Sequence, residues 1–448
     1  MLKNVLFFVL VSGVVVGCAP STKHFPAIEK NIYHQNYPAA IQGLKKSKKE
    51  YREKDQVVYR VEMGMLLHLD GKFKESNQQL QSAEREMEDL YTKSITDEAG
   101  SYFTNDNTMA YSGEDFERVM VNVFGAINYV FLGEWNEALV EARRVDHKLN
   151  VFNDKYKEKN VYKEDAFARY LSGILYEAQG EESDAFVAYR KAYDTYRSYQ
   201  RNYGTQVPER LKTDLLRVTK SLGLTEEYNT YRRQFSGTRE LPEDVYRSKG
   251  ELVFFSYNGL SPIKVEDVLM MNIPKPGRRG IYVLKIAFPK FLSRANGVGY
   301  AKIILKSSSG GVVEARTFEA EDIESIAIKN LQDRIGRIRG KAIARATAKY
   351  LATAAVEAEV KEQSGPLAGA LVGLIGNVAA AATETIDQRS WRLLPASIHM
   401  GRVVVPPGTY QVTIQYYGKG GQKLEKRNLG AINLRSGRKT FLKTRYSR

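Results

Sequence analysis

The stretch GILYEAQGEESDA, residues 173–185, decides how the first half of this chain is interpreted. Gly180 stands inside it, with a small residue seven positions earlier (Gly173) and another five positions later (Ala185). A glycine permits the positive φ that ends a helix, and small residues let two neighbouring helices approach closely. The spacing therefore predicts two antiparallel helices joined by a tight turn at Gly180.

The same spacing occurs twice upstream, which indicates an internal repeat. The two earlier copies are Gly64, Gly71 and Ser76, and Ala126, Gly133 and Ala138. A further small position holds Ala83 and Ala192 in the outer copies but Val145 in the middle one. These positions resemble the small-and-large signature sites of the tetratricopeptide repeat. Because stacked pairs form a solenoid, residues 18–236 are expected to be a TPR-like helical domain.

A solenoid presents one concave face, made by the first helix of each pair. The residues expected on it form a candidate partner-binding groove: Val61, Met65, His68, Val123, Ile127, Tyr170, Ile174 and Glu177. An exposed apolar and aromatic groove would suit a peptide or a helix of a partner. The alternative is that these side chains pack on the next helix or on the C-terminal half of the chain.

After Gly237 the pattern changes to short β-branched and aromatic runs bounded by Gly, Pro or Asn. The expected strands are 251–257, 281–287, 298–306, 312–318, 397–405, 409–417, 430–434 and 439–444. Such spacing is typical of a β-sandwich or a small barrel. We therefore expect an α+β chain: an N-terminal TPR-like α-solenoid, then a β-sandwich-like domain over residues 237–448.

A helical insertion at about 319–385 interrupts the strands. Its first part is basic, and its candidate polyanion-binding residues are Arg334, Arg337, Arg339, Lys341 and Arg345. Its second part, 366–383, is uncharged and carries Gly369 and Gly373 at a spacing that favours close helix packing. Three interpretations stay open: a helical hairpin packed on the sheet, an element on or in a bilayer, or an oligomerisation element.

The N-terminus reads as a secretory signal that ends at Cys18. Lys3 precedes an apolar run from Val5 to Val16, which is too short to span a bilayer. The sequence Val15-Val16-Gly17-Cys18 resembles the bacterial lipobox. The resemblance implies cleavage after residue 17 and a lipid-modified, N-acylated Cys18. By analogy with lipoprotein sorting, Ala19 rather than Asp favours the outer membrane.

Composition narrows the possible partners. The chain has a net charge of +15 and one cysteine. No internal disulfide is therefore possible, and a lone thiol outside the cytoplasm is a liability unless acylation consumes it. The charge indicates either simple solubility or contact with anionic lipids and polysaccharides, and no nucleic acid is expected for an exported chain. No phosphate-binding fingerprint, metal-spaced histidine cluster or nucleophile motif stands out, so we expect no enzyme activity, metal or cofactor.

Taken whole, the chain resembles a family of proteobacterial lipoproteins with TPR-like repeats. The residues that carry the likeness lie in four segments: Asn105–Thr108 with Tyr111 and Gly113–Glu117, Ala138–Arg144, Asn258–Gly259, and Asp387–Pro395. In the last segment we expect Asp387 to pair with Arg389 and Trp391 to plug the edge of the sandwich. The family carries no established catalytic residues, so the resemblance implies none here.

These patterns predict a lipid-anchored scaffold on the periplasmic side of the outer membrane. It would bind a protein of an envelope-assembly or cell-wall machine through its helical groove. The alternative is a structural lipoprotein whose basic surface binds anionic envelope polymers or lipids. Fold alone does not decide between them.

Overall fold

The computed structural model of the chain describes residues 23–96, 109–156, 162–274, 281–364 and 386–447. The predicted signal 1–17, the lipid-attachment residue Cys18 and the uncharged segment 366–383 lie outside these ranges.

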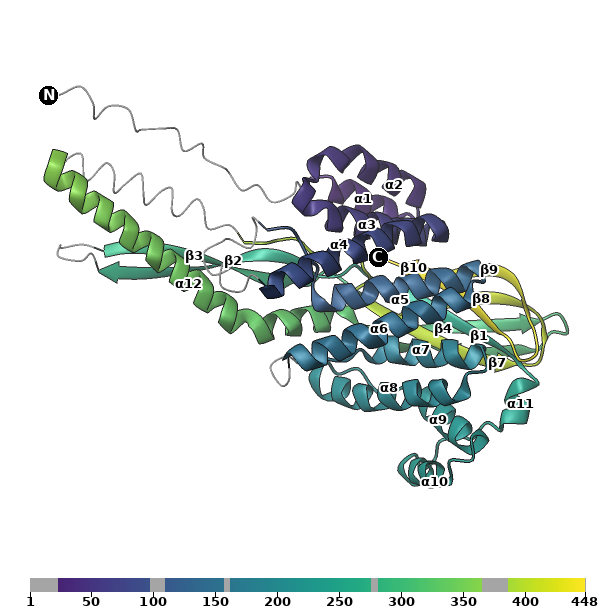
Figure 1. Cartoon of the computed structure of the whole chain (residues 1–448). Coiled ribbons are helices and arrows are strands. Elements are labelled where there is room, and N and C mark those ends of the chain that lie inside the picture. Colours follow the sequence, from purple (N-terminus) through teal and green to yellow (C-terminus); the bar gives the residue numbers. More distant parts are fainter. Residues whose placement is uncertain (1–22, 97–108, 157–161, 275–280, 365–385, 448) are drawn as a thin grey trace.

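The first half consists of consecutive helical pairs (Figure 1). The pairs are α1 (Phe25–Tyr33) with α2 (Tyr37–Lys46), α3 (Gln56–Leu69) with α4 (Phe73–Thr96), α5 (Asp115–Leu132) with α6 (Trp135–Tyr156), α7 (Ala166–Ala178) with α8 (Glu182–Asn202), and α9 (Glu209–Ser221) with α10 (Thr225–Gln234). The second helix of each pair packs against the first helix of the next from α2 to α9. The predicted array of TPR-like helical pairs is therefore present, and the short helix α11 (Glu243–Arg247) follows it.

The small residues of the repeat lie where two helices touch. A Cβ on Gly173 would lie 2.4 Å from Cδ1 of Tyr189 in α8, and one on Gly64 would lie 2.7 Å from Cδ2 of Leu80 in α4. Gly180 adopts a φ of +79° in the turn between α7 and α8. These contacts agree with the prediction that small residues at the repeat positions let the paired helices approach closely.

The strands form three sheets. The central sheet has the order β10 (Lys439–Tyr446), β1 (Gly250–Asn258), β7 (Ser397–Val405) and β6 (Phe318–Asp322). The outer sheet has the order β5 (Val312–Arg316), β4 (Val298–Ser307), β8 (Gly408–Gly418) and β9 (Lys423–Leu434). The third is a two-stranded ribbon of β2 (Ile263–Pro274) and β3 (Ile281–Leu292). β1 runs parallel to β10 and antiparallel to β7.

The two middle strands of the central sheet, β1 and β7, are buried on both faces. Along β1, Val253, Phe255 and Tyr257 join the core that contains the helices, whereas Leu252 and Phe254 join the core shared with the outer sheet. This alternation is the period-two pattern of a strand. One hydrophobic core therefore crosses the boundary expected between residues 236 and 237.

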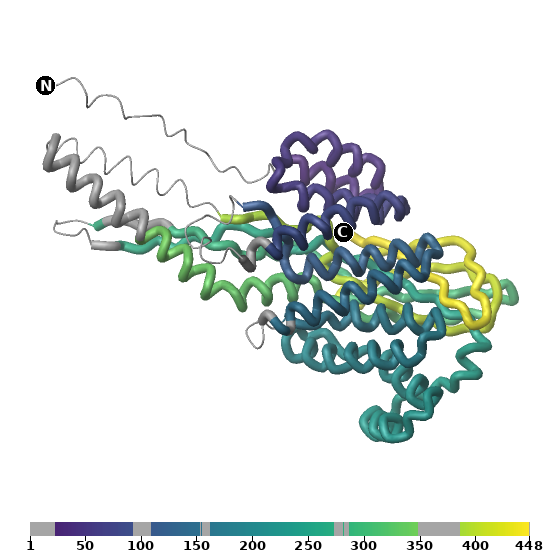
Figure 2. Tube along the Cα trace, in the orientation of Figure 1, coloured from purple at the N-terminus to yellow at the C-terminus, as the bar shows by residue number. Residues whose placement is uncertain are grey.

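The ribbon and the long helix α12 (Ile323–Ser364) form a projecting element that we call the arm. It extends away from the helical pairs and the two four-stranded sheets (Figures 1 and 2). Ile286 and Phe288 of β3 pack on Ala342 and Ala346 of α12, which gives the arm a small core of its own. α12 matches the first, basic part of the predicted helical insertion. In the part of the chain that the structure describes, no helix has both the length and the apolar character to cross a bilayer.

Candidate functional sites on the helical array and the arm

The candidate groove is not open. Of its eight residues, the seven from Val61 to Ile174 are at most 1% exposed, and the side chain of Glu177 is 6% exposed. The central sheet packs on the concave face of the helices, so the array's own chain fills the place expected for a partner. The predicted open groove is therefore wrong, and these side chains instead pack within a core that contains both neighbouring helices and strands of the C-terminal half.

His68 shows how a predicted groove residue is used instead. Its Nδ1 lies 2.6 Å from Oδ1 of Asn128, and its Nε2 lies 3.1 Å from the hydroxyl of Tyr257 in β1. Burial, with Lys443 and Arg445 nearby, lowers the pKa of His68 well below its usual value. His68 therefore links the helices to the central sheet through buried polar contacts and does not contact an external ligand.

Two segments that carry the family resemblance meet in space. Oε1 of Glu117 accepts the backbone N–H of Trp391 at 2.7 Å, and the hydroxyl of Tyr111 donates to Oε2 of Glu117 at 2.6 Å. The guanidinium of Arg389 lies 5.3 Å from the ring of Tyr111, and its Nε lies 2.8 Å from Oδ1 of Asp387. The expected pairing of Asp387 with Arg389 is therefore present.

Trp391 lies deeper than expected. It is 1% exposed, and its ring centroid lies 6.0 Å from that of Phe124 in α5, so it plugs the helical core rather than a sheet edge. Beside it, Glu62 of α3 accepts the backbone N–H groups of Arg392 at 2.7 Å and Leu393 at 3.0 Å. Residues 391–393 are thus fastened to the helices by carboxylates that lie far away in sequence.

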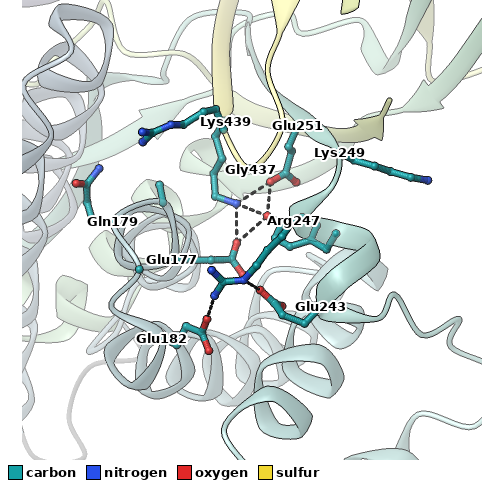
Figure 3. A pocket seen from close by; sticks show the side chains of 13 residues that line it. Glu177, Gln179, Glu182, Glu243, Arg247, Lys249, Glu251, Gly437 and Lys439 are labelled. Atoms are coloured by element: carbon teal, nitrogen blue, oxygen red, sulfur yellow. Dashed lines mark hydrogen bonds and ion pairs between the residues drawn. The ribbon is translucent and has the colours of Figure 1, made fainter. Parts of the chain in front are cut away.

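The second site is a cavity of about 230 Å³ at the end of α7, which we call the ionic pocket (Figure 3). Helix α11, strand β1 and the turn before β10 complete its walls. Nζ of Lys439 lies 2.6 Å from Oε2 of Glu177 and 2.8 Å from Oε2 of Glu251, and it also contacts the hydroxyl of Tyr246. Arg247 bridges Glu182 and Glu243 at the rim.

The buried charged side chains of this pocket lie beside side chains of opposite charge. Burial lowers the pKa of Lys439 to about 8, although Glu251 beside it acts in the opposite direction. Burial alone would raise the pKa of Glu251, but Arg402 and Lys439 hold it well below its usual value. Arg402, on β7, also binds Asp214 of α9. The described contacts therefore tie α7, α9 and α11 to β1, β7 and β10.

Sequence reasoning found only one member of this pocket, Glu177, and assigned it to an open groove. Lys439, Glu251 and Arg402 carry no local signal, because the residues that pair with them are distant in sequence. In the described part of the chain, no three His, Cys, Asp or Glu side chains gather as metal ligands.

The candidate polyanion-binding residues do not all share one environment. Arg334 and Lys264 both bind Glu114, a buried residue that also caps α5. Burial would raise the pKa of Glu114, but the two cations lower it to about 2. Arg334 therefore fastens the root of the arm. The other four candidates, Arg337, Arg339, Lys341 and Arg345, lie further along α12.

The arm also carries apolar side chains that water reaches. Val268, Leu269, Met270 and Met271 form a continuous run on β2 with exposed fractions of 40, 42, 67 and 36%. Ile281, at the start of β3, is 64% exposed. Because successive side chains of a strand point to opposite faces, each face of the ribbon carries two of these four exposed residues. Clustered apolar side chains of this kind mark an interaction site more often than scattered single residues do.

No protein-family model matches the sequence, and no curated protein matches it. Among solved structures, the chain is similar to MamA (16% identity, 46% of this chain and 90% of that one, TM-score 0.29). It is also similar to a Podosopora anserina kinesin light chain with nearly identical TPR-like repeats (13% identity, 47% and 91%, TM-score 0.31). A third is the Rap conjugation gene regulator of plasmid pLS20 in complex with the Phr* peptide (17% identity, 48% and 53%, TM-score 0.28). At these TM-scores the likeness assigns no function.

Proposed function

We propose that this protein is a lipid-anchored scaffold of the outer membrane that holds an envelope component through its arm. Cys18 carries the lipid, the body faces the periplasm, and no catalysis is involved. The observation that carries the proposal is the exposed apolar run 268–271 on an element that projects from the body.

The rest of the body suits a rigid platform. The central sheet fills the concave face of the helices, and the ionic pocket ties their far end to three strands. Glu114 ties the root of the arm to α5 through Lys264 and Arg334. An arm held at its root in this way presents its apolar side chains at a fixed place, which reduces the entropy lost on binding.

The sequence supports the lipid anchor independently. Cys18 is the only cysteine and follows an apolar run at the lipobox spacing. Several acyl chains give stable membrane attachment, whereas a single chain does not. The envelope component that the arm holds is a protein of an envelope-assembly or cell-wall machine; the second candidate is an anionic lipid or polymer.

Single-cysteine variants test this function in cells whose outer membrane has been made permeable. Met270→Cys and the matched control Val312→Cys place a thiol at two apolar strand residues that are 67% and 56% exposed. A charged maleimide is added, and labelling is normalised to that after denaturation in detergent. We expect Met270→Cys to react severalfold more slowly than Val312→Cys, because an envelope component covers the arm.

The wild-type chain serves as the second control. If Cys18 is acylated, the wild-type protein has no thiol and takes up no label even after denaturation. Full labelling of the denatured wild-type chain would contradict the anchor. Equal labelling rates for the two variants in cells would contradict the role of the arm.

A further inference from the structure

We propose that a cavity between α9 and the strands β4, β5 and β6 binds a short peptide whose amino and carboxyl ends are both free. Arg316 binds the carboxylate of this peptide, and Glu319 binds its ammonium group. In Figure 1, α9 lies across the body from the tip of the arm, so this site is separate from the surface on which the proposed function rests.

The cavity has a volume of about 600 Å³ and lies where the helical array meets both four-stranded sheets. The loop between α8 and α9 and the first turn of α9 form one wall. The start of β4, the end of β5 and the start of β6 form the other. Small-molecule sites typically have volumes of about 300 to 1,000 Å³. The cavity is therefore large enough for two or three linked amino acids.

Five of the described charged side chains line this cavity, and the fold itself neutralises three of them. The neutralised side chains are Arg210 and Arg402, which both pair with Asp214 and Glu251, and Glu209, which pairs with Lys212. The two that remain are Arg316 and Glu319. A ligand of this cavity therefore meets one cation and one anion whose charges are still uncompensated.

Arg316, at the end of β5, holds its guanidinium against an aromatic ring. The guanidinium lies 3.5 Å from the ring centroid of Tyr300, and Tyr300 in turn stacks on Tyr417 with the ring centroids 4.7 Å apart. In the described part of the chain no carboxylate forms an ion pair with Arg316, since Glu314 of the same strand pairs with Lys302. A stacked guanidinium keeps its N–H groups available at its edge. Arg316 is thus held ready to bind a carboxylate through two parallel hydrogen bonds.

Glu319, in β6, is the acid without a cationic partner. Its side chain is 41% exposed, and its Oε1 accepts the hydroxyl of Thr205 at 3.3 Å. No lysine or arginine among the described residues forms an ion pair with it. His399, whose Nε2 lies 3.8 Å from Oε2, lowers the pKa of Glu319, so the side chain is ionised at neutral pH. An ionised carboxylate only accepts hydrogen bonds, and an ammonium group therefore complements it.

One ligand can satisfy both charges. Arg316 and Glu319 do not pair with each other, and their Cα atoms, three residues apart, are separated by at most about 10 Å. An extended peptide gains about 3.5 Å for each residue, so the two ends of a dipeptide or tripeptide are about 7 to 10 Å apart. Tyr300 and Phe318 also line the cavity and offer apolar contact to a side chain between those ends.

Isothermal titration calorimetry tests the site on the acylated full-length protein in detergent. The probe is the tripeptide Ala-Leu-Ala in three forms: with free ends, with an amidated carboxyl end, and with an acetylated amino end. We expect each blocked form to bind about 10-fold more weakly than the free form, because each loses one charged hydrogen-bonding partner. Equal affinities of the three forms would overturn the proposal, as would a Kd above about 1 mM for the free form.

Two variants assign the ends of the peptide. Arg316→Gln is expected to bind the free form about 10-fold more weakly and to bind it no better than the amide. Glu319→Gln is expected to bind the free form no better than the acetylated form, while it still discriminates against the amide. The control Lys306→Gln removes an exposed cation of β4 that does not line the cavity, and it should bind like the wild-type protein.

The thermal melting temperature of each variant shows whether it folds. If Glu319→Gln melts at a lower temperature because the contact with Thr205 is changed, the exposed residue Arg316 and the blocked peptides still decide the question. A folded Arg316→Gln protein that still prefers the free form over the amide would overturn the role of Arg316. A loss of affinity in Lys306→Gln equal to that in Arg316→Gln would show that general positive charge attracts the peptide, and the proposed site would fall.

Discussion

At the scale of single residues, the joint between the helices and the strands depends on buried carboxylates. Glu62 is fully buried and receives the backbone N–H groups of Arg392 and Leu393. Burial raises its pKa to about 8, although the two N–H groups act in the opposite direction. A carboxyl group with so high a pKa links the stability of the fold to pH.

The sign of this link follows from proton binding. Unfolded Glu62 releases its proton near pH 4.5, whereas the folded protein keeps it until about pH 8. Between these values the folded state binds more protons, so the free energy of unfolding contributed by Glu62 falls as pH rises, by up to about 1.4 kcal/mol per pH unit.

We therefore expect Glu62→Gln to destabilise the protein more at pH 5 than at pH 8. The variant loses one hydrogen bond at every pH, but it no longer titrates, while the wild-type protein loses stability over this range. Urea unfolding at pH 5, 6.5 and 8 measures the difference in free energy. The control Glu75→Gln, on the exposed surface of α4, should stay within about 0.5 kcal/mol of the wild-type protein. A cost of Glu62→Gln that is the same at all three pH values would show that Glu62 does not titrate there.

At the scale of elements, the effect of replacing a helical glycine depends on how closely another helix packs on it. Gly173→Ala places a methyl group 2.4 Å from the buried ring of Tyr189, so we expect a loss of about 1–3 kcal/mol in the free energy of unfolding. Gly336→Ala, on α12, meets no atom within 4 Å and should stabilise the helix by about 0.5–1 kcal/mol. Urea unfolding of both variants compares the two signs. A stabilising Gly173→Ala would contradict the close packing of α7 on α8.

The elements were predicted best where the signal was local. The spacing of small residues around Gly71, Gly133 and Gly180 predicted the helical pairs. Two helices can approach closely only where such residues occur, so each contact leaves a local signal in the sequence. Most strands followed from β-rich runs. Strand β2 was missed because Glu266 and Asp267 break its alternation and its apolar residues are exposed on both sides of the ribbon.

The candidate sites were predicted less well, for a different physical reason. The apolar concave face was identified, but an apolar face has the same composition whether a partner or the chain's own sheet covers it. The ionic pocket joins Glu177, Glu251 and Lys439, and no local spacing specifies which distant charges will meet. The basic part of α12 was located, yet only the structure shows that Arg334 is tied to Glu114.

At the scale of the whole molecule, one core joins the two halves, so they should unfold together. Both tryptophans report on the joint: Trp391 lies 6.0 Å from Phe124 in α5, and Trp135 lies 5.8 Å from Phe441 in β10. We expect tryptophan fluorescence and far-ultraviolet circular dichroism to give coincident urea transitions. A fluorescence transition that precedes the loss of helical signal would mean that the strands detach before the helices unfold.

The sheet inside the concave face also restricts how this architecture can change. Ordinary solenoids gain or lose whole repeats because each repeat contacts only its neighbours. Here α3, α5, α7 and α9 also contact strands of the central sheet, so a duplicated pair would overhang the sheet and a deleted pair would leave part of it uncovered. Variation among descendants of this chain should therefore accumulate in loop lengths and at the far end of the arm, with the number of helical pairs conserved.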